Sequence, residues 1–172
     1  MSHWKWSGTY EENNRLDWSL MKDGPIVKYH SADTLEIDVN ELEKMGYRII
    51  DISVVNWTRE NAHKKIKNDF DFPDYYGENL AAFEDCLTDL FNNRLPGLVI
   101  VFRQFDSFYK REIQFSKGLL DAIYRQSWSW LLAGNKLITL LHSDDPDLEI
   151  MEIGGFSPVW NGKEWIDSIR RK

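Results

Sequence analysis

Seven carboxylates fall within one stretch of the chain, from Asn68 to Asn93, and this stretch contains no Lys or Arg. They surround the string Phe72-Pro73-Asp74-Tyr75-Tyr76-Gly77-Glu78-Asn79-Leu80. Carboxylates of uniform sign beside a rigid aromatic pair are suited to binding a positively charged surface. A merely solubilising acidic face has the same composition, so the pattern alone leaves both interpretations open. The seven are Asp69, Asp71, Asp74, Glu78, Glu84, Asp85 and Asp89.

The residues around these carboxylates predict a turn followed by a helix. Pro73 disfavours helix and Gly77 permits a tight bend, so a turn is expected from Pro73 to Glu78. Asn79 can cap a helix that begins directly after it. At about 100° per residue, two faces result. The apolar face carries Leu80, Phe83, Leu87, Leu90 and Phe91, and the open face carries Ala81, Ala82, Asp85, Thr88 and Asp89.

Other chemistries find little support in the sequence. Glu84 and Asp85 are adjacent, so on a helix they point about 100° apart and cannot act as paired catalytic acids. Cys86 lies among apolar residues and is predicted to be a buried, inert thiol. The histidines have no metal-ligand spacing, and no phosphate-binding glycine loop occurs. We therefore predict a protein that is not an enzyme and holds no metal or cofactor. The histidines are His3, His30, His63 and His142.

Composition points to one folded domain with added segments. The chain has 172 residues, 42% hydrophobic and 14% aromatic, which is enough to bury a sizeable core. Its net charge of -7 argues against direct binding of nucleic acid, whose phosphates attract Lys and Arg, and favours a basic partner. No apolar run approaches the ~20 residues that span a bilayer, and residues 1–8 lack the apolar core of a secretory signal. The sequence predicts a cytoplasmic protein without membrane contact.

The string from Pro73 to Leu80, followed by Asp85-Cys86-Leu87-Thr88, resembles the signature of the barstar family of intracellular ribonuclease inhibitors. The resemblance covers residues 47–142. Around the motif, we expect strands at Arg48 to Val54, Leu98 to Phe102 and Leu137 to Leu141, and helices at Thr58 to Asn68 and Phe115 to Gln126. The resemblance implies an α/β fold in which three parallel strands are flanked by helices. Alternation of strands and helices along the chain agrees with such a fold.

The resemblance also implies a binding surface. Family members plug a nuclease's phosphate-binding cleft with this loop and helix, and Asp85 matches the aspartate that imitates an RNA phosphate. Ala81, Glu84 and Asp89-Leu90 depart from the family pattern, and Gln126 stands where a later acidic contact is expected. Tyr76 could pack under the loop or face outward. The predicted partner-binding residues are Tyr75, Gly77, Asn79, Ala81, Glu84, Asp85, Thr88, Asp89 and Gln126.

Two segments lie outside the resemblance. Residues 1–46 contain Trp4, Trp6 and Trp18 with turn signals at Asn13-Asn14 and Asp23-Gly24-Pro25, which predicts short strands and turns packed on the core. In residues 143–172, Asn161-Gly162 between Trp160 and Trp165 predicts a β hairpin. We therefore expect extra antiparallel hairpins on the three-stranded core. The tryptophans are expected to pack, with a carbohydrate- or base-stacking platform as the alternative.

The leading hypothesis is an immunity protein that inhibits a cognate basic nuclease toxin, a ribonuclease, by plugging its cleft with the acidic helix. A DNA-cutting enzyme also has a phosphate-binding cleft that such a plug would fit. The alternative is a barstar-fold binding module that has lost nuclease inhibition.

Overall fold

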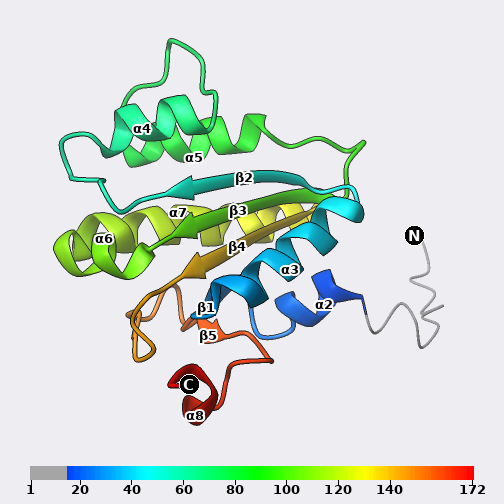
Figure 1. The fold of residues 1–172 in the computed structure, drawn as a ribbon. Helices are drawn as coiled ribbons and strands as arrows, with labels where there is room; N and C mark the ends of the chain where they lie inside the picture. Colours follow the sequence, from blue (N-terminus) through cyan, green and yellow to red (C-terminus); the bar gives the residue numbers. More distant parts are fainter. Residues whose placement is uncertain (1–14) are drawn as a thin grey trace.

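The computed structural model of the protein describes residues 15–172 and shows a single parallel sheet between two layers of helices (Figure 1). The strand order is β2-β3-β4-β1-β5, and each recorded strand pairing is parallel. The strands are β1 (Ile26–Tyr29), β2 (Arg48–Ser53), β3 (Gly97–Arg103), β4 (Lys136–His142) and β5 (Val159–Trp160). The helices are α2 (Leu16–Met21), α3 (Ala32–Lys44), α4 (Ala62–Asp69), α5 (Leu80–Asp89), α6 (Phe105–Arg111), α7 (Ile113–Leu132) and α8 (Asp167–Arg170).

The central strands are apolar along their whole length because helices cover both faces of the sheet. In β3, Leu98, Ile100 and Phe102 face the core formed with α4, α5, α6 and α7. The intervening Val99 and Val101 face a second core formed with α2 and α3. At the start of β3, Gly97 lies so close to β4 that a Cβ atom would come 1.9 Å from the Lys136 carbonyl oxygen. The two strands therefore require glycine there.

Several predicted elements are confirmed at close to their expected positions. β2 and β4 match the predicted strands, and α5 begins directly after Asn79. Helix α7 is longer than predicted, with 20 residues. Helix α4 begins at Ala62 rather than Thr58, because Thr58 to Asn61 form a turn in which the Thr58 amide donates to Asn61 Oδ1 at 2.8 Å.

The prediction for the flanking segments is wrong in its topology: the sheet has five parallel strands rather than three with antiparallel hairpins. β1 joins β4, and β5 joins β1 with Val27 opposite Val159 and Lys28 opposite Trp160. The Asn161-Gly162 turn therefore does not close a hairpin. The Lys28 ammonium lies 4.6 Å and the Arg170 guanidinium 4.5 Å from the centroid of the Trp160 ring.

The first segment also holds more helix than expected. The 13-residue α3 extends over residues 32–44, and Ser31 caps it by accepting from the Thr34 amide at 3.1 Å. The turn at Asp23-Gly24-Pro25 is present, with the Gly24 amide donating to the Met21 carbonyl at 3.0 Å. Trp4, Trp6 and Asn13-Asn14 lie outside the described residues. Within residues 15–172, no helix is both long enough and apolar enough to span a bilayer.

Candidate protein-binding surface

The loop between α4 and α5 projects from the molecule at the top of Figure 1 and is held at both ends. Asn79 caps α5, with Oδ1 accepting from the Ala82 amide at 2.9 Å while Nδ2 donates to the Gly77 carbonyl at 3.0 Å. Within the loop, the Tyr76 amide donates to the Pro73 carbonyl at 3.0 Å. Glu78 adopts a left-handed backbone with φ of 48° directly before the cap. These contacts fix the loop against the helix start.

The two tyrosines of the loop point in opposite directions. Tyr75 is 76% exposed, whereas Tyr76 is 5% exposed and packs against Phe72. The Tyr76 hydroxyl lies 2.6 Å from Nδ1 of His63 on α4. Of the two orientations left open by the sequence, Tyr76 therefore adopts the buried one, and Tyr75 is the aromatic ring that a partner can reach.

The inner face of α5 packs as the spacing of its apolar residues predicts. Phe83, Cys86 and Leu87 are buried, and Leu80 lies against α7, where a Cβ on Gly118 would come 2.5 Å from Leu80 Cδ1. This close approach fixes the position of α5 on α7. Burial raises the pKa of the Cys86 thiol, and the nearby Asp89 and Asp85 raise it further, which is opposite to the shift that activates a nucleophilic cysteine.

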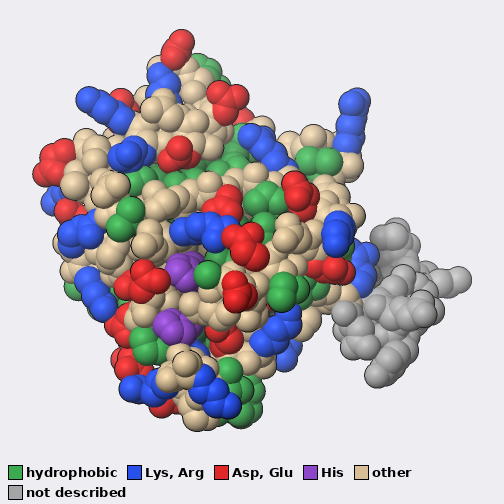
Figure 2. Space-filling model, in the orientation of Figure 1, with side chains coloured by type: hydrophobic (Ala, Val, Ile, Leu, Met, Phe, Trp, Pro, Cys, Tyr) green, Lys and Arg blue, Asp and Glu red, His purple; other side chains and the backbone are tan. Residues whose placement is uncertain are grey.

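The outer face of α5 carries Ala81, Asp85, Thr88 and Asp89, all of them exposed. Within residues 15–172, the Asp85 carboxylate makes no hydrogen bond or ion pair. It therefore points to solvent on a helix that the core holds in place. The face of the molecule seen in Figure 2 intersperses acidic and basic side chains, so there the net negative charge is not gathered into one large field.

The expectation of an acidic helix without any compensating base is wrong at Glu84. Arg125 on α7 donates to both Glu84 oxygens, at 3.1 and 2.7 Å, and also pairs with Asp121. Hydrogen bonds from Arg125 lower the pKa of Glu84 despite its partial burial. Arg125 lies 41 residues from Glu84 in sequence, and the packing of α7 beside α5 brings the two side chains together. The sequence alone therefore does not predict this ion pair. At the loop, Lys67 likewise pairs with Asp74 at 2.9 Å.

Gln126 also reaches this surface. The Thr88 hydroxyl donates to Gln126 Oε1 at 3.0 Å, which links α5 to α7 beside the Glu84 pair. The structure thus brings Glu84, Thr88 and Gln126 into one cluster with Arg125. Sequence reasoning missed Arg125, although its spacing of four residues from Asp121 predicts that these two side chains share a face of α7.

The sequence model of a family described as Barstar (barnase inhibitor) matches residues 47–142, more than half of the chain. The chain belongs to the barstar family. A relative from Bacillus subtilis (strain 168), named "Putative ribonuclease inhibitor YrdF", is 47% identical over 47 residues. That match covers 27% of this chain and 48% of the relative, so the chain spans about half of the relative's length.

In this barstar-family protein, the predicted binding residues fall into two adjoining groups. Tyr75, Gly77, Asn79 and Ala81 surround the N-terminus of α5, where Asn79 is engaged as the cap. Further along the helix lie the residues Glu84, Asp85, Thr88 and Asp89, together with Gln126 of α7. Among residues 15–172, no group of three or more His, Cys, Asp or Glu side chains is arranged to hold a metal ion.

Proposed function

We propose that this protein inhibits a ribonuclease by inserting α5 and the Tyr75 loop into the basic active-site cleft of the enzyme. The observation that carries the proposal is Asp85, an exposed carboxylate without an ion pair in the described chain, on a rigidly packed helix of a barstar-family fold. The name of the Bacillus subtilis relative supports the same class of partner. In this role the protein would act in the cytoplasm as the immunity protein for a nuclease toxin made by the same cell.

The mechanism is occlusion of the cleft rather than chemistry on RNA. A nuclease cleft collects Lys, Arg and His to hold phosphates, so the net charge of -7 would speed encounter with it. The association of barnase with barstar is a known example of such electrostatic steering. Once docked, Asp85 would replace a phosphate among the enzyme's cations, and Tyr75 would supply an aromatic anchor.

Glu84 has a different role from the one its charge suggested. Because Arg125 and Gln126 already engage this side chain, Asp85 and Asp89 are the carboxylates of α5 that are free to meet a basic partner. Glu84 and Arg125 would then shape the edge of the surface. This arrangement explains how the protein keeps acidic contacts while departing from the family pattern at several positions.

The proposal is tested by Asp85→Ala against barnase and against any secreted basic nuclease that a neighbouring reading frame proves to encode. Removing Asp85 would leave desolvated cations in the cleft, so the expected loss of binding free energy is about 2–5 kcal/mol. Glu41→Ala is the matched control because Glu41 is an exposed acid of α3, which packs on the opposite face of the sheet from α5. Inhibition by Asp85→Ala that equals inhibition by the unchanged protein would overturn the proposal.

A second candidate function rests on aromatic side chains far from Asp85 in sequence. Trp18 is 48% and Trp128 is 50% exposed, and with Tyr124 and Phe156 they line a cavity of about 430 Å³. This cavity would suit a binding module that recruits a partner other than a nuclease. Trp18→Ala and Trp128→Ala test it without removing residues 1–46, which supply a strand of the sheet. Full nuclease inhibition by both variants would separate the cavity from the inhibitory surface.

A further inference from the structure

The loop that presents Tyr75 is supported from beneath by a histidine. His63 on α4 is partly buried, and its ring packs edge-on against Phe115 of α7 at a centroid distance of 5.1 Å. Its Nδ1 lies 2.6 Å from the hydroxyl of Tyr76. Within residues 15–172, the Tyr76 hydroxyl has no other hydrogen-bond partner. This contact joins the loop to α4.

We infer that His63 is the positioning residue of the binding loop, and that it holds Tyr75 in its presenting orientation only while its imidazole is neutral. The inference rests on the proposed function for its biological consequence, because Tyr75 is the aromatic contact proposed there. The contact between His63 and Tyr76 can be followed in the free protein, without a partner.

The chemistry of the contact explains the dependence on protonation. Neutral His63 with its proton on Nε2 leaves Nδ1 free to accept from the Tyr76 hydroxyl. Protonation places a hydrogen on Nδ1, so the imidazolium can only donate toward the tyrosine oxygen. The hydroxyl hydrogen must then turn away, although Tyr76 is almost fully buried. The direction of the contact is thereby reversed, and within residues 15–172 the buried hydroxyl hydrogen is left without an acceptor.

The surroundings of His63 favour its neutral form. Burial lowers the pKa of His63, and the opposing influence of the Glu78 carboxylate in the loop is smaller. Phe115 presents an uncharged ring from α7, and burial, together with the Cys86 thiol of α5, raises the pKa of the Tyr76 hydroxyl. On α4 and the turn before it, Glu60, Lys64 and Lys67 stand within one helical turn of His63. The contact should therefore persist at neutral pH.

The test follows the free protein by NMR between about pH 7.5 and 5, where a histidine of ordinary pKa near 6.5 titrates. His63 should titrate below that value. After correction for intrinsic exchange, the Tyr76 amide, which donates to the Pro73 carbonyl, should exchange about threefold to tenfold faster once His63 is protonated, as expected for the loss of one hydrogen bond. Loop exchange that does not follow the His63 titration would overturn the inference.

Three variants sharpen this test. His63→Gln retains an acceptor but cannot titrate, so loop exchange should become independent of pH. Tyr76→Phe removes the hydroxyl and should give fast loop exchange at every pH. His30→Gln is the control, since His30 contacts the Ser143 carbonyl away from the loop and should leave the pH dependence unchanged. The same pH dependence in His63→Gln as in the unchanged protein would contradict the assignment.

Inhibition of barnase at pH 7.5 and 5.5 then separates the inference from the proposed function. The unchanged protein should lose more affinity at low pH than His63→Gln does. Because both proteins are measured against the same enzyme, the enzyme's own pH dependence is common to both. Equal losses would refute the link between His63 and binding. Absence of inhibition at either pH, with loop exchange behaving as expected, would refute the proposed function and leave the positioning role of His63 intact.

Discussion

At Tyr75 and Tyr76, two neighbouring phenol rings have different tasks, one in solvent and one in the core. Tyr75→Ala should change the free energy of unfolding by no more than about 0.5 kcal/mol, because its ring is 76% exposed. It should nevertheless weaken nuclease binding by about 2 kcal/mol, as expected for an aromatic anchor. Tyr76→Ala should destabilise the fold by about 3 kcal/mol, since it empties a buried site.

Urea denaturation of the two variants, combined with an inhibition assay, checks this contrast. The single variants serve as controls for each other because they remove the same side chain one position apart. A Tyr75→Ala protein that unfolds as easily as Tyr76→Ala would contradict the assigned orientations.

At the scale of the elements, a buried carboxylate is among the contacts that join the C-terminal segment to the rest of the fold. Glu164 accepts from the amides of His30 at 3.1 Å and Ser31 at 2.6 Å, at the N-terminus of α3. Asn161 donates to the same carboxylate at 2.5 Å. Such a site favours a negative charge, because the helix dipole and free amides both point at it.

Glu164→Ala should therefore reduce the free energy of unfolding by about 1.5–3 kcal/mol, the range for hydrogen bonds to a charged group. The segment after β5 should also open more often, so trypsin should cleave after Lys163 faster than in the unchanged protein. Glu152→Ala, an exposed acid in the preceding loop, is the control. Unchanged cleavage at Lys163 would show that other contacts hold the segment.

The same region shows why sequence reasoning succeeded for some elements and failed for others. Asn79, its turn and the apolar spacing of α5 are local signals, so the start and inner face of that helix were predictable. The Asn161-Gly162 turn gave an equally clear local signal, yet pairing of β5 with β1 prevailed over it. Contacts such as Glu164 with His30, 134 residues apart, leave no local trace. For the binding surface, Asp85 was predicted, whereas the Arg125 partner of Glu84 was not.

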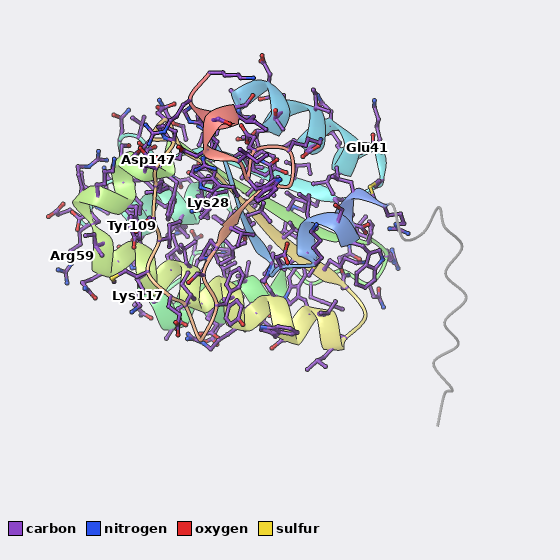
Figure 3. The ribbon with its side chains drawn as sticks, turned by 90° about the horizontal axis from the view of Figure 1, so that it is seen from below. Lys28, Glu41, Arg59, Tyr109, Lys117 and Asp147 are labelled. Atoms are coloured by element: carbon purple, nitrogen blue, oxygen red, sulfur yellow. The ribbon has the colours of Figure 1, made fainter. Side chains whose placement is uncertain are left out.

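For the molecule as a whole, buried ionisable groups predict an unusual response to alkaline pH. Burial, with a smaller contribution from the Arg170 charge, lowers the pKa of Lys28, labelled in Figure 3, to about 8. Burial also raises the pKa values of Tyr29 and Tyr47 above their usual range. The Asp38 carboxylate raises the pKa of Tyr29 further, and the Asp17 carboxylate raises that of Tyr47. Between about pH 8 and 10, the unfolded chain therefore binds more protons at Lys28 than the native protein does.

Because stability rises with pH wherever the unfolded state binds more protons, the free energy of unfolding should gain on the order of 2 kcal/mol from Lys28 between about pH 8 and 10. Above about pH 10 the tyrosines reverse the trend, since they ionise in the unfolded chain but not in the native protein. Denaturation across this range measures the effect. Lys28→Met should abolish the rise and exposed Lys64→Met should not; a rise that survives in Lys28→Met would refute the assignment.

The position of β1 between β4 and β5 makes residues outside the family match indispensable to the sheet. A fragment limited to residues 47–142 would keep β2, β3 and β4 but would leave β4 without its neighbour. β4 is buried from Leu137 to His142, so its bare backbone edge would offer an apolar template for strands of other molecules. By pairing with β4, β1 therefore covers the edge at which such self-association would occur.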